Sequence, residues 1–314
     1  MRENTKIENL RQIIYKELVE LAECQYALFD LPYHTNIGDG LIWEGEKQFL
    51  KEMMANCVHA SSYFTCHWPK LETDVKVLIH GGGNFGDLYR EHFDFVKKVI
   101  EHYPNNRIVF FPQTIYYVNE EVLKSDMELI NSHGNVLVCA RDAKSYDLIR
   151  PYLNMGGVKL VPDMAFCISI PALALPQTNR GLAIIRRDGE LNGKTFSYLK
   201  NLKVEKKDWP TFYHRPFDGT FVFKVLAKFA HWNVWGSKSL LNVYCRRFFS
   251  ANLLNIGLKF YKGYSEIYTT RLHGCILAIL TGRKCWLLDN NYGKNSTFYF
   301  TWLKDFENIE YVKL

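Results

Sequence analysis

Residues 75–87, which read VKVLIHGGGNFGD, carry the pattern that decides the fold. Val75 to Ile79 is a short apolar run of the kind that forms a buried strand. A glycine-rich loop follows from His80 to Asp87, and apolar residues at helical spacing continue from Phe93 to Tyr103. A strand that leads through a loop into a helix is the repeating unit of a parallel α/β sheet. The stretch therefore predicts an α/β protein.

The same alternation of strands and helices continues on both sides of this stretch. The apolar runs predict further strands at 26–31, 107–111, 136–140, 158–161, 181–185, 266–270 and 284–288. The helical spacing predicts helices at 7–21, 41–53, 120–132, 143–153, 221–230, 253–261, 273–280 and 297–303. In the helix at 221–230, the apolar residues Val222, Val225, Leu226 and Phe229 share one face. This alternation indicates parallel sheets covered by helices.

A proline-containing segment divides the chain. Residues 169–178, SIPALALPQT, carry two prolines and interrupt the alternation, so we expect a linker there. The linker would separate an N-terminal Rossmann-like domain at 1–168 from a C-terminal one at 179–314, whose last helix could pack back on the N-terminal domain. Two such domains would face each other across a cleft. Open α/β sheets bind ligands at the carboxyl ends of their strands, where the polar loops of this sequence lie.

The composition excludes several classes of protein. Of the 314 residues, 47% are hydrophobic and 23% are charged, a globular balance that excludes a disordered, collagen-like or coiled-coil chain. No apolar run approaches the ~18 residues of a membrane span, and no signal-peptide segment opens the sequence, so we expect a cytoplasmic protein. The eight cysteines form no C-x-x-C pair and are expected to be free thiols. Cys57, His59, Cys66 and His67 follow no zinc spacing, so no metal is expected.

The positive charge is unevenly distributed. The net charge is +6, but the segment from Gly219 to Ser265 has no Asp or Glu, seven Lys and Arg, and eleven aromatic residues. Such a segment suits an anionic partner, either phospholipid headgroups or nucleic acid. Nucleic acid is disfavoured because it would leave the polar loops at the strand ends without a role. A solvated basic face over a core helix is the alternative interpretation.

Polar loops follow the strands of the N-terminal half. The glycine-rich loop, which includes Asn84, contains the pattern G-x-G-x-x-G, but the next strand ends without the acidic residue that would hold a dinucleotide ribose. Nicotinamide binding is therefore disfavoured, and a tight turn without a ligand stays open. The other loops contain, in order, His34 to Asp39, Gln113 with Thr114, Arg141 with Asp142, and Asp163. Together they would line a cleft for hydroxyl-rich or phosphorylated ligands.

Cations follow the strands of the C-terminal half. Arg186 and Arg187 end one strand and suit a phosphate or carboxylate, and strand alternation lets only one of them face the cleft. The segment TTRLHG, 269–274, joins a strand to a helix, so Arg271 could bind an anion. His273 would lie in the first helical turn, where it suits a proton transfer near neutral pH or merely caps the helix. Lys294 adds a cation after the last strand, and the absence of D-x-D argues against a metal-dependent glycosyltransferase.

These motifs, in order, resemble those of the bacterial polysaccharide pyruvyl transferases. They are PYHTNIGD (32–39), IHGGGNFGDLY (79–89), FPQTIYY (111–117), RDAKSYDL (141–148), VPDMAF (161–166), TRLHG (270–274) and LDNNYGKNS with FYFTWL (288–303). The resemblance implies a glycosyltransferase-B-like architecture of two Rossmann-like domains. It also implies transfer of a pyruvyl group from phosphoenolpyruvate to a sugar, usually as a cyclic ketal across two hydroxyls, with no metal and no cofactor.

The resemblance also implies roles for individual residues. The residues that it implies for the donor are Arg186 or Arg187, Arg271, Leu272, His273, Lys294 and Asn295, with His273 as the proton donor. The residues expected on the acceptor side are His34, Asn36, Asn84 and Gln113, and the general base is expected to be Asp39, Asp87 or His34. Cys275 stands where many relatives have a histidine, and we expect it to pack rather than react.

The resemblance finally implies an acceptor and leaves two alternatives. Acceptors in capsule and exopolysaccharide synthesis are commonly sugars on undecaprenyl diphosphate, so Gly219 to Ser265 could rest on the inner face of an anionic membrane. The main alternative is a glycosyltransferase of the same architecture that uses a nucleotide sugar, which would need a nucleotide pocket where this sequence has cations. A carbohydrate-binding relative without activity is disfavoured because the arginines, RLHG and NYGKNS are all present.

Overall fold

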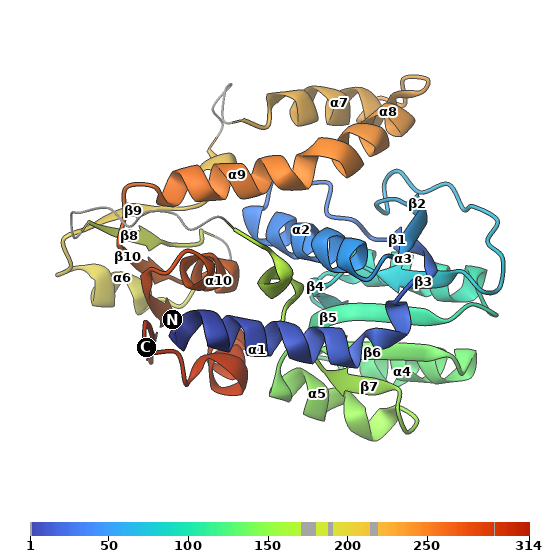
Figure 1. Ribbon diagram of the computed structural model, residues 1–314, viewed down its shortest axis with the longest axis horizontal. Coiled ribbons are helices and arrows are strands. Elements are labelled where there is room, and N and C mark those ends of the chain that lie inside the picture. The colour runs from blue at the N-terminus through green and yellow to red at the C-terminus, as the bar shows by residue number, and fades with distance from the viewer. Residues whose placement is uncertain (1, 171–179, 188–190, 214–218, 292) are drawn as a thin grey trace.

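The computed structural model describes residues 2–170, 180–187, 191–213, 219–291 and 293–314. Within these ranges the strands form two parallel sheets, one of seven strands and one of five (Figure 1). The predicted α/β class with parallel sheets is therefore confirmed. Residues 171–178 of the predicted linker lie outside the described residues, and the division into two domains stays a prediction. None of the described helices has the length and hydrophobicity needed to span a bilayer.

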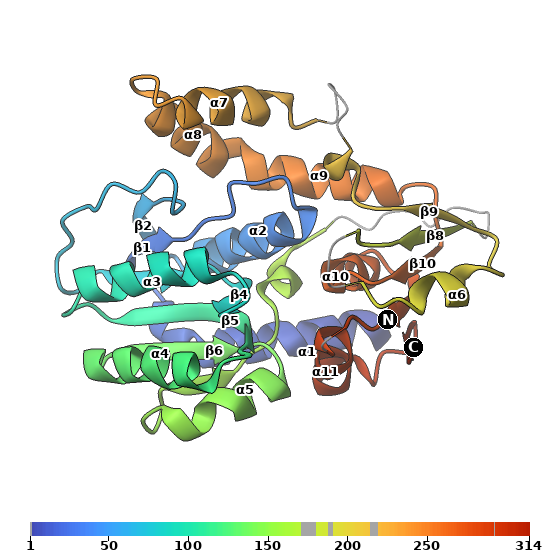
Figure 2. The same ribbon diagram turned by 180° about the vertical axis from the view of Figure 1, so that it is seen from behind.

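The N-terminal sheet is built from the first half of the chain. Its strands, in spatial order, are β2 (Asn56–Ala60), β1 (Gln25–Phe29), β3 (Lys76–Ile79), β5 (Ile108–Tyr116), β6 (Val136–Ala140) and β7 (Val158–Leu160), and β4 (Gly82–Gly86) also pairs with β5. Its helices are α1 (Arg2–Glu17), α2 (Ile37–Glu52), α3 (Arg90–His102), α4 (Glu120–His133) and α5 (Ala143–Ile149). Short 3-10 turns are η1 (Val19–Leu21), η2 (Arg150–Tyr152) and η3 (Met164–Cys167). Figures 1 and 2 show its helices on both faces of the sheet.

The C-terminal sheet follows the same plan. Its spatial order is β12 (Ile309–Val312), β11 (Lys284–Leu288), β10 (Glu266–Thr269), β8 (Gly181–Ile184) and β9 (Val204–Lys207). Its helices are α6 (Thr195–Leu199), α7 (Phe221–His231), α8 (Ser237–Tyr244), α9 (Ser250–Tyr261), α10 (Leu272–Leu280) and α11 (Lys294–Phe298). A 3-10 turn, η4 (Pro210–Phe212), and two π-helical turns, η5 (Cys245–Phe249) and η6 (Tyr299–Leu303), complete it.

The glycine-rich segment is a strand where the sequence predicts a loop. β4 pairs in parallel with β5, with Gly82 opposite Gln113 and Gly86 opposite Tyr116. Gly86 has a φ of +132°, and a Cβ atom there would lie 1.9 Å from the Tyr116 carbonyl oxygen. Glycine has a low intrinsic preference for strands, so composition alone favours a loop. The close approach of the two backbones, which only glycine allows, overrides that preference.

The predicted apolar face of α7 packs on the core only in part, through Leu226. Val222 is 50% exposed and Phe229 is 45% exposed, while Phe223 and Ala230 are the residues of this helix that are buried. Helical spacing identifies a face but not the element that covers it.

Helix α2 contacts elements of both halves. It packs against α9 and α10 from the C-terminal half and against η3, which follows β7. Glycines permit these contacts, because a Cβ atom at Gly40 would lie 2.7 Å from the Leu253 side chain and one at Gly45 would lie 2.0 Å from the Met164 carbonyl oxygen. The C-terminal end adds a further connection, in which the Trp302 indole donates to the Arg141 carbonyl oxygen at 2.7 Å. Helix α2 and the C-terminal end thereby connect the two halves of the chain.

Replacing Gly45 by alanine tests this close packing. Alanine favours a helix over glycine by about 1 kcal/mol, but the clash with the Met164 carbonyl forces α2 away from η3. We expect Gly45→Ala to lower the free energy of unfolding by about 1–3 kcal/mol, measured by urea denaturation. Gly193→Ala is the matched control, because a Cβ atom there meets nothing within 4 Å, and it should cause no loss. Equal stability of the two variants would contradict this packing.

Candidate active site

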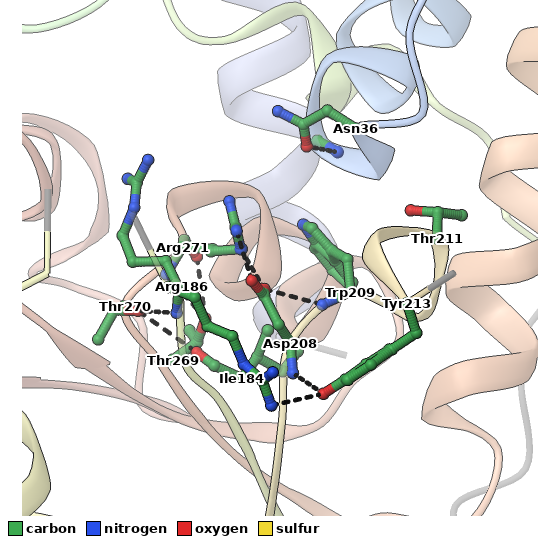
Figure 3. Close-up of polar contacts among 12 residues, drawn as sticks. Asn36, Ile184, Arg186, Asp208, Trp209, Thr211, Tyr213, Thr269, Thr270 and Arg271 are labelled. Atoms are coloured by element: carbon green, nitrogen blue, oxygen red, sulfur yellow. Dashed lines mark hydrogen bonds and ion pairs between the residues drawn. The ribbon is translucent and has the colours of Figure 1, made fainter. Parts of the chain in front are cut away.

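A cavity of about 250 Å³ is lined by residues from both halves of the chain. It brings together ten of the residues predicted from the sequence, namely His34, Asn36, Asp39, Asn84, Arg186, Arg271, Leu272, His273, Lys294 and Asn295. Figure 3 shows Asn36, at the start of α2, on the opposite side of a gap from Arg186 and Arg271. Most of the residues that line the cavity are therefore candidates that the sequence placed in loops at strand ends.

Asp87 and Gln113 do not line the cavity, although the sequence suggested them for the base and the acceptor. The Asp87 carboxylate accepts hydrogen bonds from the backbone N–H groups of Val118 and Asn119, both at 2.8 Å, in the turn before α4. The Gln113 amide is buried and donates to the His80 carbonyl oxygen at 2.6 Å. Both side chains therefore bind backbone groups outside the cavity.

Arg186 rather than Arg187 lines the cavity. The backbone N–H of Arg186 donates to the Thr270 hydroxyl at 3.0 Å, which ties the end of β8 to the end of β10. The Arg187 guanidinium instead lies over the Tyr213 ring, 5.1 Å from its centroid, and donates to the Tyr213 hydroxyl at 3.3 Å. Strand alternation predicts that only one of the two arginines faces the cleft. It does not tell which one, because the sequence does not show which face of the strand is turned toward the cleft.

Arg141 is a cation that the sequence placed at a strand end beside the expected cleft but to which it gave no donor or acceptor role. Its side chain is fully buried, its Nε donates to the Thr114 hydroxyl at 2.7 Å, and its Nη1 donates to Asp163 at 2.8 Å. Its Nη2 is buried and has no hydrogen-bond partner among the described residues. Buried guanidinium N–H groups are almost always paired, so Nη2 is a donor available for a ligand in the cavity.

The backbone at Gly83 leaves room for two cations. A Cβ atom there would lie 2.8 Å from the Lys294 Nζ and 3.6 Å from the Arg141 Nη2. Glycine at this position therefore lets cations from α11 and from the end of β6 approach the same part of β4. Two cations so close together at one wall favour an anion between them.

Arg271 is held by an acidic residue that sequence reasoning missed. Its Nε and Nη2 donate to the two carboxylate oxygens of Asp208 at 2.6 and 2.8 Å, and its guanidinium lies 4.9 Å from the centroid of the Phe212 ring. The Asp208 carboxylate also accepts from the Trp209 backbone N–H at 2.8 Å (Figure 3). The Arg271 guanidinium is thus fixed in position, and its charge is partly neutralised by Asp208. Asp208 lies in the sequence KKDWP, which has no spacing that indicates this partner.

His273 is fixed between the two halves of the chain. Its Nε2 lies 3.2 Å from the Asp163 carboxylate, and a Cβ atom at Gly38 would lie 2.8 Å from its Nδ1. Burial raises the pKa of Asp163, but His273 and Arg141 together outweigh burial and hold that pKa well below its usual range. Asp163 therefore stays ionised and can fix the imidazole orientation. Cys275, in the same helix, is fully buried, in keeping with a packing role.

His34 and Asp39 form a second polar pair on the α2 side of the cavity. Asp39 lies 3.6 Å from the His34 Nε2 and accepts from the Asn36 amide at 2.7 Å, while Asn36 caps α2 by accepting from the Gly38 N–H. Burial raises the pKa of Asp39, but His34 and His273 outweigh burial and lower it. Burial lowers the pKa of His34 despite the Asp39 charge. A neutral imidazole beside a carboxylate is able to accept a proton.

A buried ion pair supports this wall from behind. The His80 Nδ1 lies 2.7 Å from the Glu46 carboxylate, which also accepts from the Gly81 backbone N–H at 2.7 Å. Burial on its own lowers the pKa of His80, but the Glu46 charge outweighs burial and places the pKa above its ordinary value of 6.5. The pair joins α2 to the loop between β3 and β4.

No metal-binding arrangement accompanies these residues. Among the described residues, no group of three or more His, Cys, Asp or Glu side chains is placed to hold a metal ion. All eight cysteines are free. Cys57, His59, Cys66 and His67 give no such group, although the His59 and His67 rings contact each other with centroids 5.1 Å apart.

The sequence profile of the polysaccharide pyruvyl transferases matches residues 36–292. The matched range contains Arg141, Asp163, Arg186, Arg271 and His273. The chain belongs to the polysaccharide pyruvyl transferase family. As a member of that family it is a transferase that transfers pyruvyl groups to polysaccharide.

Relatives of this pyruvyl transferase include bacterial and fungal proteins. The chain is 31% identical to "Putative pyruvyl transferase EpsO" of Bacillus subtilis, over 95% of this chain and 90% of that protein. It is 26% identical to "Pyruvyl transferase 1" of Schizosaccharomyces pombe, over 88% of this chain and 69% of that protein. A crystal structure of a functionally uncharacterized Klebsiella pneumoniae protein matches with a TM-score of 0.67 and 19% identity, over 98% of this chain and 99% of that one. This last likeness shows a shared fold.

The His80–Glu46 pair of this pyruvyl transferase predicts a pH-dependent stability. Because the pKa of His80 is raised on folding, its contribution to stability is complete below about pH 6.5 and is lost as the pH rises through the raised pKa. Glu46→Gln should therefore lower the free energy of unfolding by about 3–5 kcal/mol at about pH 6, and by less as the pH rises from there toward about 9. Urea denaturation across this range measures the difference.

The exposed Glu101, replaced in the same way by glutamine, is the control and should show almost no difference at any pH. A Glu46→Gln deficit that stays constant between about pH 6 and pH 9 would mean that the ion pair does not stabilise the fold.

Proposed function

We propose that the chain transfers the pyruvyl group of phosphoenolpyruvate to two hydroxyls of a sugar and forms a pyruvate ketal. The observation that carries the proposal concerns Arg141, which lines the cavity and whose buried Nη2 has no partner among the described residues. Arg186, Arg271 and Lys294 line the same cavity. Phosphoenolpyruvate carries a phosphate and a carboxylate, so it needs several cations held in one small space.

The size of the cavity supports a small donor over a nucleotide sugar. Ligand pockets commonly measure about 300–1,000 Å³, and the cavity of about 250 Å³ lies below that range. The space suits phosphoenolpyruvate together with the reacting edge of one sugar. A nucleotide would need further space for its base and ribose, and the C-terminal side of the cavity has three cations, Arg186, Arg271 and Lys294, together with Trp209, Leu272, His273 and Asn295. A second pocket of about 430 Å³ also contains Arg186, and it is where a base would have to lie.

The donor is bound from several directions. Arg141 Nη2 and Lys294 contact β4 near Gly83, so they are suited to one acidic group of the donor. Arg186 and the remaining N–H groups of Arg271 lie on the C-terminal side and are suited to the other acidic group. Asp208 fixes Arg271 in place, which limits the entropy lost when the donor binds.

His273 supplies the first proton in the proposed reaction. Its imidazolium gives a proton to the methylene carbon of phosphoenolpyruvate, so that a methyl group and an oxocarbenium centre form. A sugar hydroxyl attacks that centre through its oxygen, and His34, supported by Asp39, takes the hydroxyl proton. Asp163 stays ionised and stabilises the positive charge on His273 before the transfer.

The second half of the reaction releases phosphate. The carbon–oxygen bond to the phosphate breaks, the phosphate leaves with the bonding electron pair, and a second oxocarbenium centre forms. The second sugar hydroxyl attacks through its oxygen and its proton passes to the departing phosphate, which closes the ketal. Arg141, Arg186 and Lys294 neutralise the charge of the departing phosphate. One phosphoenolpyruvate and two hydroxyls thus give one ketal and one phosphate, without a metal or a cofactor.

The proposed acceptor is a sugar of a polysaccharide precursor carried on undecaprenyl diphosphate. His34, Asn36 and Asn84 lie on the N-terminal side of the cavity, where their polar groups are suited to sugar hydroxyls. An acceptor with a lipid anchor places the reaction at the inner face of the membrane.

Arg186 and Arg187 give a matched pair of variants for donor binding. Removing a charged hydrogen-bond partner costs about 1.5–3 kcal/mol, so Arg186→Gln should weaken binding of phosphoenolpyruvate by roughly 10- to 100-fold in isothermal titration. Arg187→Gln removes the same charge one residue away, outside the cavity, and should bind with nearly wild-type affinity. Binding of a nucleotide sugar in place of phosphoenolpyruvate would support the glycosyltransferase alternative.

Variants of His273 separate proton donation from donor binding. His273→Gln should reduce kcat of ketal formation by about 10²- to 10⁴-fold while changing the affinity for phosphoenolpyruvate far less. Asp163→Asn should also reduce kcat, because the amide does not stabilise the charged imidazole. His102→Gln, on the last turn of α3 away from the cavity, is the control. A His273→Gln variant that keeps near-normal turnover would exclude His273 as the acid.

A further inference from the structure

The exposed apolar side chains of this protein are concentrated on one helical hairpin. Of the twenty-two large apolar side chains that are exposed in the described part of the chain, nine lie between residues 221 and 248. We call these nine the α7–α8 surface: Phe221, Val222, Phe229, Trp232, Val234, Trp235, Leu240, Val243 and Phe248. The Phe229 and Trp232 rings contact each other with centroids 6.0 Å apart, and clustered exposed apolar side chains mark an interaction site more often than single exposed residues do.

The outer position of the hairpin leaves this surface open. Figures 1 and 2 show α7 and α8 on the far side of α9, away from both sheets. Val222 and Phe229 of α7 and Trp232, which directly follows it, share a face at helical spacing, while Ala230 is buried. Trp235, in the turn before α8, is 99% exposed. The aromatic residues therefore project from the outermost part of the molecule.

The charge of the hairpin complements an anionic surface. Lys224, Lys228, Lys238, Arg246 and Arg247 lie in α7, α8 and η5, and no Asp or Glu occurs from residue 219 to 265. The Lys228 Nζ lies 4.8 Å from the centroid of the Trp232 ring, so a cation accompanies an exposed aromatic side chain. A symmetric contact between two copies of this surface would place only like charges opposite one another, which disfavours self-association.

The hairpin is fixed to the wall of the cavity. The Tyr33 hydroxyl donates to the Asn242 side-chain oxygen at 2.5 Å, and Tyr33 directly precedes His34 in the loop that lines the cavity. The Asn242 amide donates to the Ala60 carbonyl oxygen at 3.0 Å. α9, which continues from the hairpin, packs along α2. A surface bound at the hairpin would thus lie at a set position relative to the cavity.

We infer that the α7–α8 surface docks on an anionic lipid bilayer, with Trp232 and Trp235 in the headgroup layer and the exposed Lys228 and Arg247 on the phosphates. Tryptophan prefers this interfacial layer, and cations on the same helices add attraction to anionic lipids. The inference rests on the proposed function in one respect, namely that docking would give the cavity access to a lipid-linked sugar. Binding to the bilayer itself follows from the surface alone.

Flotation with lipid vesicles tests the inference on the full chain. Vesicles of phosphatidylcholine with phosphatidylglycerol should carry the protein upward at low salt, and vesicles of phosphatidylcholine alone should carry much less. The double variant Trp232→Ser, Trp235→Ser should lower the partition coefficient by more than about tenfold, because two large apolar side chains no longer enter the interface. Lys228→Gln and Arg247→Gln should each lower it by about fivefold.

A matched control uses exposed apolar residues elsewhere. Met155 and Val118 are 103% and 79% exposed and lie in the N-terminal half, so Met155→Ser with Val118→Ser should leave vesicle binding unchanged. Equal flotation with anionic and neutral vesicles, or binding insensitive to the tryptophan variants, would overturn the inference. Self-association that the tryptophan variants abolish, without vesicle binding, would also overturn it. Phosphoenolpyruvate titration of the same samples separates this failure from failure of the proposed function.

Discussion

The buried carboxylate of Asp163 is the group on which the candidate site depends. It accepts from the Arg141 Nη1 at 2.8 Å and lies 3.2 Å from the His273 Nε2, and only 1% of its side chain is exposed. Arg141 follows the N-terminal sheet and His273 begins α10, beside the C-terminal sheet. Breaking such a buried pair costs about 3–5 kcal/mol, because it leaves an uncompensated charge. One carboxylate therefore sets the position of a cation and of the proposed proton donor together.

The close approach of backbone to side chain at three glycines completes this arrangement. Gly38 lets the His273 ring lie against the first turn of α2, Gly45 lets α2 lie against η3, and Gly83 gives space to Lys294 and Arg141. A Cβ atom at any of these positions would come within 2.0–2.8 Å of another atom. The glycines thus act as spacers: they allow α2, η3 and α10 to approach closely enough for charges from both halves to line one small cavity.

Hydrophobic periodicity and loop composition predicted the strands and the polar loops at their ends, because these features depend on residues close together in the sequence. The apolar runs that precede His80 and Arg186 are strands, and the parallel pairing of β8 with β10 brings Arg186 near Arg271. The pairing of Arg271 with Asp208 could not be predicted, because the two residues lie 63 positions apart and no spacing relates them. The strand at Gly82–Gly86 depends on its pairing with β5, and the exposure of the α7 face depends on which element covers it. The strand at Gly82–Gly86 and the exposure of the α7 face both depend on tertiary contacts, which the periodicity of the sequence does not predict.

The crystal structure of the protein with bound phosphoenolpyruvate tests the central claim, namely that the cavity between the two sheets is a cation-lined donor site. The account predicts that the Arg141 Nη2 donates to an oxygen of the donor phosphate or carboxylate, with Lys294 and Arg186 on the acidic groups and the methylene carbon facing His273. Electron density for the donor outside this cavity, or a donor in the cavity that leaves the Arg141 Nη2 without a partner, would contradict it.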